Sequence, residues 1–363
     1  MRVAIDAREL CGHPTGVGRY LSRLLTAWAV SDRARRHDLT LIAHAPIAAE
    51  PGWRVTTSIV PGGGGTAWEQ MTLPGAVAAA RADLLFAPGY TAPLTVTTPL
   101  VLTIHDVSYF AHPEWFSFRE GTRRRMLTAW SARRARKVIT VSNFSKTEIE
   151  RFIGIKDVRA IPHGIDRIEG RPDVLPGTSS TDRSMILYVG SVFERRRVDR
   201  LIASFDQIVA RVPNATLEIV GENRTRGVDL DALRLRSKHA DRIFLRSYVD
   251  EATLEQLYRD ASVLAFLSEY EGFGFTPLEA VTRGVPPVVL DTPIARETYG
   301  EAAIYVPPSA SNDEIAAIIA NLITNNDTRR AALSHAGGVL ARYDWTRAAE
   351  DTLSVLEEAV LGR

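Results

Sequence analysis

Cysteine, long apolar runs and metal-binding patterns are scarce in this chain of 363 residues. The one cysteine, Cys11, excludes an internal disulfide and a metal cage built from cysteines. No apolar stretch approaches the roughly 18 residues that a membrane-spanning helix needs. No cluster of His, Asp and Glu has metal-ligand spacing, and no G-x-S-x-G nucleophile motif is present. We therefore expect a protein with no disulfide, no membrane span and no metal site.

The charge of the chain is unevenly distributed. Residues 1–165 carry 21 Lys and Arg against 13 Asp and Glu, a net charge of +8, whereas the remaining residues carry a net charge of −7. Such an asymmetry predicts an anionic partner for the first half, and we expect no nucleic-acid partner. The amino terminus enters a strand-like pattern directly, so we expect no signal peptide and a cytoplasmic, water-soluble protein.

Short apolar segments alternate with amphipathic segments along the chain. The length suggests about two domains. Strands that alternate with helices predict an α/β fold with parallel sheets. The predicted strands are 3–6, 39–43, 55–60, 84–87, 100–104, 138–141, 158–161, 185–189, 215–220, 243–246, 263–266, 287–290 and 304–306. The predicted helices include 17–30, 198–211, 254–261 and 345–360.

Residues 166–181 separate two halves of this pattern. Pro, Gly and Ser dominate the segment and no apolar period survives in it, which is typical of a linker. We therefore divide the chain into a first domain at 1–168, a linker at 169–183, a second domain at 184–342 and a closing segment at 343–363.

The most informative stretch is 268–280, S-E-Y-E-G-F-G-F-T-P-L-E-A. It places Glu271 and Glu279 on either side of a glycine-rich turn that opens a helix. Gly272 and Gly274 allow the backbone to approach a ligand, and Pro277 suits the first turn of a helix. Free N–H groups at such a helix start favour an anionic or hydroxyl-rich ligand.

This segment resembles the E-G-F-G-x-x-x-L-E signature of the retaining glycosyltransferases of family 4. The resemblance implies the GT-B fold, in which two Rossmann-like parallel-sheet domains face a central cleft and the last helix crosses back to the first domain. It also implies that Glu271 lies beside the donor sugar and that Glu279 binds the ribose of the nucleotide sugar. The backbone that contacts the donor would belong to Gly272, Phe273, Gly274 and Phe275.

A second part of the resemblance follows the predicted strand 185–189. Gly190 and Ser191 are followed by three arginines, and the family uses this strand–glycine–basic loop to hold the donor diphosphate. Arg196 stands where the family usually has lysine, with Arg195 beside it, and a guanidinium can bind phosphate oxygens through two parallel bonds. We expect Arg195 and Arg196 to stabilise the leaving diphosphate and Arg197 to face solvent.

Three further positions complete the predicted site. Gly16 opens the helix 17–30, and the resemblance makes it part of a glycine loop that faces the cleft. His105 follows the strand 100–104, at the end of the strand where open α/β sheets bind ligands, and the resemblance places it near the donor sugar. Val249 lies in the loop that binds the nucleobase in the family.

The segment 112–116, H-P-E-W-F, with His105-Asp106 before it, resembles bacterial polysaccharide mannosyltransferases. The predicted donor is therefore GDP-mannose, bound as a substrate rather than as a cofactor, and the predicted acceptor is a glycan or a lipid-linked sugar. We predict a retaining, metal-independent hexosyltransferase. Three alternatives stay open, namely a nucleotide-sugar epimerase of the GT-B fold, a non-catalytic nucleotide-sugar binding protein and an NAD dehydrogenase. Leu21 argues against the last of these, because a dinucleotide fingerprint needs a small residue at that position.

Residues 119–137 carry eight basic side chains and one acidic one. Met126, Leu127 and Trp130 lie among them. This mixture predicts a peripheral contact with an anionic membrane, at the inner face of the cytoplasmic membrane, and a solvated helix face is the alternative.

Overall fold

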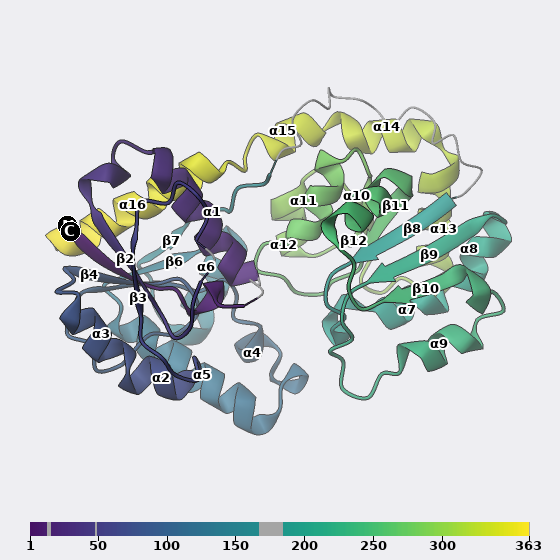
Figure 1. The fold of residues 1–363 in the computed structure, drawn as a ribbon. Helices are drawn as coiled ribbons and strands as arrows, with labels where there is room; N and C mark the ends of the chain where they lie inside the picture. Colours follow the sequence, from purple (N-terminus) through teal and green to yellow (C-terminus); the bar gives the residue numbers. More distant parts are fainter. Residues whose placement is uncertain (13–15, 48, 167–183, 363) are drawn as a thin grey trace. The chain divides into compact units, whose positions relative to one another are not determined.

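The computed structural model describes residues 1–12, 16–47, 49–166 and 184–362. The chain forms two compact units (Figure 1). Unit 1 comprises Met1–Gly164 and Tyr343–Arg363, and unit 2 comprises Ile165–Arg342. The unit boundaries fall at residues 164/165 and 342/343, and the predicted linker 169–183 lies outside the described residues.

Unit 1 is built on a seven-stranded parallel sheet in the order β3-β2-β1-β4-β5-β6-β7. Its strands are β1 (Arg2–Asp6), β2 (Asp38–Ala43), β3 (Thr56–Ile59), β4 (Leu84–Ala87), β5 (Leu100–Thr103), β6 (Lys137–Thr140) and β7 (Val158–Ala160). Its helices are α1 (Gly16–Val30), α2 (Thr66–Met71), α3 (Leu73–Ala79), α4 (Ser108–Ala111), α5 (Phe118–Arg134), α6 (Asn143–Ile153) and α16 (Trp345–Leu361).

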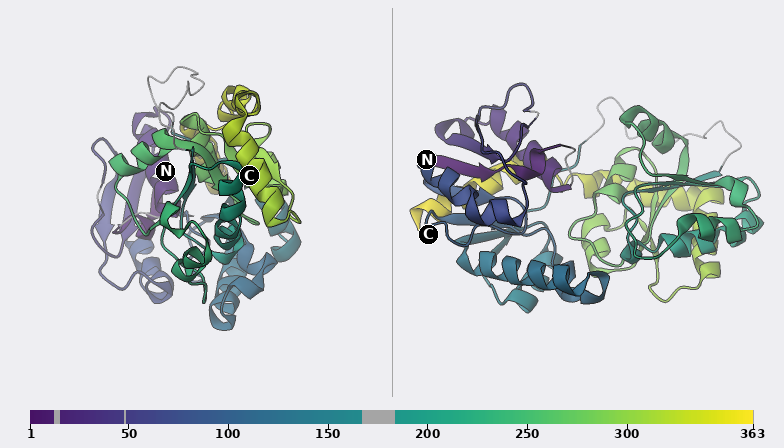
Figure 2. Two further views of the ribbon diagram at one scale, coloured as in Figure 1. Left: turned by 90° about the vertical axis from the view of Figure 1, so that its right-hand side faces the viewer. Right: turned by 60° about the horizontal axis from the view of Figure 1, so that its bottom comes forward.

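The last helix, α16, belongs to unit 1 although it follows unit 2 in the sequence (Figure 2). It packs against α1, where the indole nitrogen of Trp28 donates to the carbonyl oxygen of Ala349 at 2.9 Å. Arg33 forms an ion pair with Glu357 at 2.5 Å. Buried apolar residues of α16, including Leu353 and Leu356, join the same core as α1.

Unit 2 is built on a six-stranded parallel sheet in the order β10-β9-β8-β11-β12-β13. Its strands are β8 (Ser184–Val189), β9 (Ala215–Val220), β10 (Ile243–Arg246), β11 (Ala261–Phe266), β12 (Pro287–Leu290) and β13 (Ile304–Val306). Its helices are α7 (Val198–Ala203), α8 (Phe205–Arg211), α9 (Leu230–Arg236), α10 (Glu251–Asp260), α11 (Phe275–Thr282), α12 (Pro293–Tyr299), α13 (Asn312–Thr324), α14 (Asn326–Ser334) and α15 (Ala336–Leu340).

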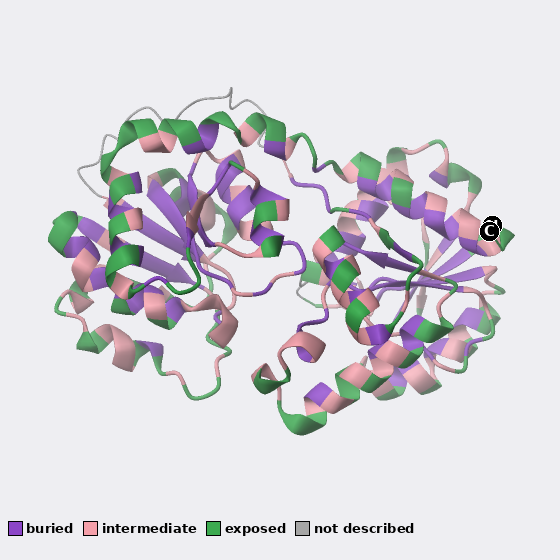
Figure 3. Ribbon diagram, turned by 180° about the vertical axis from the view of Figure 1, so that it is seen from behind, coloured by how far each residue is buried: buried purple, intermediate pink, exposed green. Residues whose placement is uncertain are grey.

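The central strands of both sheets are buried on both faces, whereas the edge strands β3 and β10 carry exposed residues, as do the outer sides of the helices (Figure 3). In β1, Val3 and Ile5 point into one core of unit 1 and Ala4 points into the other, because successive side chains of a strand alternate between faces. Covered parallel strands form continuous apolar runs, which made the central strands easy to predict. All thirteen predicted strands are present within two residues of their predicted bounds.

One predicted helix is wrong in its continuity. The helix predicted at 198–211 is two helices, α7 and α8, which are separated at Ser204. The hydroxyl of Ser204 donates to the carbonyl oxygen of Arg200 at 2.7 Å, four residues back. A serine bonded in this way competes with the helix backbone and bends the helix.

Among the described residues, no helix is long and apolar enough to span a bilayer.

Candidate functional site

Each sheet has a point where the strand order reverses. In unit 1 it lies between β1 and β4, and in unit 2 between β8 and β11. The connections that follow the two strands run to opposite faces of the sheet at such a point, so a crevice opens at the carboxyl ends of the strands, where open α/β sheets bind their ligands. The predicted site residues of unit 2 follow β8, β10 and β11. In unit 1, His105 follows β5, and Gly16 begins α1 after the connection from β1.

The loop after β8 begins at Gly190, whose φ of +128° is one that side chains rarely tolerate. A Cβ atom on this residue would lie 2.6 Å from Nη1 of Arg196. A larger residue would therefore displace the guanidinium. The loop continues through Ser191 to the short 3₁₀ helix η4 (Glu194–Arg196), which carries the two predicted phosphate-binding arginines.

Arg196 and Glu271 form the central ion pair of this site. Arg196 Nε donates to Glu271 Oε1 at 3.0 Å, and each side chain is 15% exposed. Arg196 Nη1 also donates to the carbonyl oxygen of Ser191 at 2.9 Å, and the hydroxyl of Ser268 donates to Glu271 Oε1 at 2.9 Å. The fold thus joins the loops that follow β8 and β11 through two predicted catalytic residues that are 75 positions apart in sequence.

The environment keeps Arg196 charged. Burial by itself lowers the pKa of Arg196, but the Glu271 carboxylate outweighs it and raises the pKa above its ordinary value. The guanidinium carbon lies 5.1 Å from the ring centre of Phe266. Burial raises the pKa of Tyr188 to about 12, so this residue stays neutral and its hydroxyl donates to the Ser191 carbonyl oxygen at 3.1 Å.

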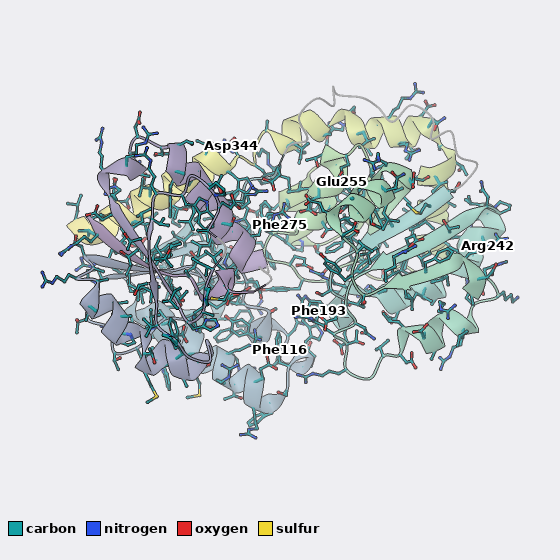
Figure 4. All side chains as sticks on the ribbon, viewed as in Figure 1. Phe116, Phe193, Arg242, Glu255, Phe275 and Asp344 are labelled. Atoms are coloured by element: carbon teal, nitrogen blue, oxygen red, sulfur yellow. The ribbon has the colours of Figure 1, made fainter. Side chains whose placement is uncertain are left out.

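Arg195, the neighbour of Arg196 in the sequence, makes a cation–π contact with Phe193, 4.4 Å from the ring centre. Phe193 is labelled in Figure 4. Within the described part of the chain, its buried Nε atom has no hydrogen-bond partner. A buried donor without a partner costs free energy, which a ligand oxygen would recover. Arg195 is therefore well suited to an anionic ligand.

The prediction that Arg197 faces solvent is wrong. Arg197 forms an ion pair with Glu269, and its Nη1 donates to the carbonyl oxygen of Pro308 at 3.0 Å. Its φ of +49° is left-handed, which turns the chain from η4 into α7. The side chain is consequently 23% exposed, and it ties the η4 loop to the segment before Glu271.

The turn before α11 brings the predicted donor-contact residues 272–275 to the start of that helix. Gly274 has a φ of +88°, and a Cβ atom there would lie 2.0 Å from the hydroxyl oxygen of Tyr299, which donates to the Gly274 carbonyl oxygen. The rings of Phe273 and Phe275 pack edge to face with their centres 5.2 Å apart. Glu279 is half-buried in the second turn of α11.

Val249 lies after β10, at the same carboxyl edge of the sheet and two strands away from β8. It is half-buried, and its neighbour Tyr248 is 82% exposed. The structure records no contact from Val249 to the Arg196–Glu271 pair, so its assignment to the nucleobase stays a prediction.

In unit 1, His105 is 8% exposed and follows β5. Its Nε2 bonds to the carbonyl oxygen of Pro88 at 2.8 Å, which links it to the connection after β4 and so to the switch point. Its neighbour Asp106 accepts a hydrogen bond from the hydroxyl of Tyr90 at 2.9 Å and another from the backbone N–H of Ser108 at 2.8 Å.

A second histidine, His163, stacks on His105 with ring centres 5.5 Å apart. Tyr20 packs against both rings, at 5.0 Å from His105 and 4.9 Å from His163. Burial lowers the pKa of His105, and burial with the nearby His105 and Arg19 lowers the pKa of His163 well below its ordinary value. Both rings are therefore neutral near pH 7.

Gly16 begins α1 and is exposed, while residues 13–15 of its glycine loop lie outside the described residues. Gly89, in the connection after β4, lies close to the next residue of α1, because a Cβ on Gly89 would be 3.3 Å from Cγ1 of Val17. The glycine-loop helix is thus beside the connection that holds His105.

Among the residues that the structure describes, no group of three or more His, Cys, Asp and Glu side chains is arranged to hold a metal ion. The metal-independent mechanism stays a prediction.

Sequence reasoning missed two residues of the site. The hydroxyl of Ser268 donates to Glu271, and the hydroxyl of Tyr90 donates to Asp106. The spacing Ser268-x-x-Glu271 was a usable signal for the first, whereas nothing in the sequence connects Tyr90 with Asp106.

Two family models match the chain. The model described as "Glycosyltransferase Family 4" matches residues 14–168, and the model described as "Glycosyl transferases group 1" matches residues 176–337. Together they match most of both units.

Curated relatives include O-antigen chain mannosyltransferase B of Escherichia coli, which is 25% identical over 265 residues, 70% of this chain and 69% of that protein. Another is the GDP-mannose:cellobiosyl-diphosphopolyprenol alpha-mannosyltransferase of Komagataeibacter xylinus, 27% identical over 276 residues, 72% of this chain and 67% of that protein.

Solved structures match over nearly the whole chain. Anabaena HepE in complex with UDP-glucose has a TM-score of 0.75 at 20% identity and covers 99% of this chain and 100% of its own. WaaG, a glycosyltransferase involved in lipopolysaccharide biosynthesis, has a TM-score of 0.74 at 17% identity and covers 98% and 99%. These likenesses show the GT-B fold. With the two model matches and the relatives, they identify the chain as a glycosyltransferase of the family 4 type.

Proposed function

We propose that this protein is a retaining, metal-independent mannosyltransferase that transfers mannose from GDP-mannose to a glycan or a lipid-linked acceptor in cell-surface polysaccharide synthesis. The observation that carries the proposal is the Arg196–Glu271 pair at the switch point of unit 2, with Arg195 beside it. The names of the relatives, O-antigen and GDP-mannose-dependent mannosyltransferases, support the sugar and the donor.

Negative charge grows on the departing diphosphate as the bond from the sugar to the phosphate breaks. The positively charged arginines stabilise this charge. Arg195 and Arg196 present guanidinium groups that bind phosphate oxygens, and one well-placed donor is worth about 10²–10³-fold in rate. The acceptor oxygen bonds to the anomeric carbon as the bond to the donor phosphate breaks. The leaving phosphate takes the acceptor proton on the same face, which retains the configuration.

Glu271 orients and polarises the sugar in this scheme and is not a nucleophile. Its Oε1 atom already accepts hydrogen bonds from Arg196 and Ser268, so the carboxylate is held in place before the ligand arrives. Glu279 binds the ribose hydroxyls from the second turn of α11. His105 contacts a sugar hydroxyl.

The donor is tested by a thermal-shift screen over GDP-, UDP- and dTDP-sugars, because a ligand that binds the native state raises the melting temperature. We expect GDP-mannose to give the largest shift and to be consumed when an acceptor is added. UDP or dTDP binding tenfold more tightly than GDP would contradict the donor assignment. Donor binding with neither hydrolysis nor transfer would favour the non-catalytic binding protein.

We also propose that unit 1 makes a peripheral contact with an anionic membrane through α5. Arg119, Arg123, Met126, Trp130 and Arg133 are all exposed, and their spacing of three and four places them on one face of the helix. Phe118, at the start of the helix, is 84% exposed. Exposed apolar side chains among arginines suit the boundary between lipid headgroups and acyl chains.

The membrane contact is tested by sedimentation with liposomes. We expect binding to vesicles that contain phosphatidylserine and little binding to neutral vesicles, since each basic residue near such a surface contributes about 1 kcal/mol. The variant Trp130→Ser should weaken binding. Leu235→Ser is a matched control, because Leu235 is a 68% exposed apolar residue on α9 of unit 2. Equal binding to neutral and anionic vesicles would reject the proposal.

A further inference from the structure

A tight turn at residues 88–91 of unit 1 has an unusual backbone. Tyr90 has a φ of +61°, and the backbone N–H of Thr91 donates to the carbonyl oxygen of Gly89 at 2.6 Å. A bond between residues i+2 and i defines a γ-turn, and the form with positive φ at its centre is rare and strained. Glycine adopts this conformation readily, so a tyrosine here points to a use for its side chain.

The γ-turn is bonded to the segment that carries His105. The Pro88 carbonyl oxygen accepts from His105 Nε2 at 2.8 Å, and the Tyr90 hydroxyl donates to Asp106 Oδ2 at 2.9 Å. The backbone N–H of Tyr90 donates to the Thr103 carbonyl oxygen at 2.8 Å. The ring centre of Tyr90 lies 5.5 Å from that of His105. Contacts on both sides of the histidine therefore fix it to the turn.

The other side of the turn is anchored to a buried ion cluster. The hydroxyl of Thr91 donates to Glu69 Oε1 at 2.6 Å, and Arg8 bridges Glu69 and Asp6 with distances of 2.8 Å to each. Asp6 and Glu69 are 3% and 1% exposed. A charged network that is buried and bonded in this way holds its members in one arrangement. The strain at Tyr90 is thus held between two fixed supports.

The same contacts define the protonation of His105. A carbonyl oxygen can only accept, so the bond to Pro88 places the imidazole proton on Nε2. Burial lowers the pKa of His105, against opposing contributions from the Pro88 carbonyl and Asp106, so the ring is neutral near pH 7. In a neutral imidazole the second nitrogen, here Nδ1, is a hydrogen-bond acceptor.

We propose that Tyr90 is a positioning residue that, together with the Pro88 carbonyl, holds the His105 imidazole in its Nε2–H form and leaves Nδ1 to accept a hydrogen bond from a sugar hydroxyl. A lone pair matches a hydroxyl donor and repels a phosphate or carboxylate oxygen. The inference rests on the proposed function for the identity of the ligand as a sugar. It adds Tyr90 as the residue that orients the His105 ring. It also adds the Nε2–H tautomer as the reason why the ring selects a hydroxyl.

The kinetic test compares Tyr90→Phe with Tyr109→Phe. Tyr90→Phe keeps the ring and removes the bond to Asp106. Tyr109 is the matched control, because its hydroxyl donates to Thr128 at 3.0 Å and does not touch His105 or Asp106. We expect Tyr90→Phe to lower kcat about tenfold or more while the donor KM changes less than about twofold. An unchanged kcat in Tyr90→Phe, or an equal loss in Tyr109→Phe, would overturn the proposal.

A spectroscopic test does not depend on activity. In ¹⁵N-edited NMR spectra of the free protein, His105 should be a single Nε2–H tautomer. Tyr90→Phe removes one anchor of the turn that carries the Pro88 carbonyl, so a population of the Nδ1–H tautomer should appear in that variant. A wild-type His105 protonated on Nδ1, or a spectrum that Tyr90→Phe leaves unchanged, would overturn the positioning role. The expected spectra in a protein that turns over no nucleotide sugar would instead reject the proposed function alone.

Discussion

The two switch points share a strand order and differ in their chemistry. In unit 2 the loops after β8 and β11 place arginines against carboxylates, with Arg196 and Glu271 at 3.0 Å and Arg197 beside Glu269. In unit 1 the equivalent edge presents two stacked neutral histidines among tyrosines, and its buried charges pair with one another behind the γ-turn.

The difference teaches what each edge can bind. Guanidinium groups at the edge of unit 2 suit a diphosphate, whose charge they can offset. Neutral imidazole and phenol groups in unit 1 suit hydroxyls, which need directed hydrogen bonds and no counter-charge. One topology therefore supports two recognition chemistries, and the side chains on the loops decide which one is present.

The largest effect should come from Glu271. We expect Glu271→Gln to lower kcat by about 10²–10³-fold while nucleotide affinity changes less, because the charge that orients the sugar is lost and the shape is kept. The measurements are kcat and the Kd for GDP. Glu269→Gln is the matched control, since Glu269 pairs with Arg197 instead. A near-normal kcat in Glu271→Gln would remove Glu271 from the mechanism.

The arginine that replaces the family's lysine should come next. We expect Arg196→Ala to lower kcat/KM by about 10²-fold and Arg196→Lys to lower it less, because an ammonium still supplies charge without the two-pronged geometry. Arg211→Ala is the control, since Arg211 pairs with Asp313 at the surface of the same unit. Equal activity in the two alanine variants would show that the η4 loop is only a basic surface.

A smaller effect is expected at Glu279. Loss of a hydrogen bond to a charged group costs about 1.5–3 kcal/mol, so Glu279→Ala should weaken donor binding by roughly 10- to 100-fold. Isothermal titration with GDP-mannose and with free mannose would separate the nucleotide from the sugar. An unchanged Kd for GDP-mannose would remove Glu279 from the ribose site.

The smallest effect concerns the acid stability that the buried histidine pair of unit 1 confers. The native pKa values of His105 and His163 lie below their ordinary values, so the unfolded chain binds more protons at low pH. The contribution of these two histidines to the free energy of unfolding is fully present above about pH 6.5. It decreases as the pH drops, by up to about 1.4 kcal/mol per pH unit for each histidine. Thermal melts from pH 7.5 to 5 should show a shallower decline for His163→Gln. Identical slopes would contradict the neutral pair.

Much of the fold was predictable because the covered central strands of both sheets are largely apolar. The pattern of the second unit gave β8 to β13 within two residues, and the glycine, proline and glutamate spacing at 268–280 indicated the turn before α11. The break at Ser204 was not predictable, because a serine in mid-helix can face solvent or bond back to the backbone, and the sequence does not say which.

The sequence did not predict which residues contact the site residues. Arg197 was expected to face solvent, because the sequence does not show which of three consecutive arginines points into the site. The left-handed turn at this residue directs its side chain to Glu269, which is 72 positions away. Ion pairs at such separations depend on which strands are neighbours.

By itself the sequence determined the parallel α/β architecture and the identity of the chemical groups, because apolar periodicity and the residue types at glycine-rich loops act locally. Only the tertiary structure decided that Arg196 meets Glu271, that His105 stacks on His163, and that a strained γ-turn at Tyr90 supports Asp106. These contacts join loops from strands that are distant in the chain. Strand order, which is set by the packing of whole helices against whole sheets, brings those loops together.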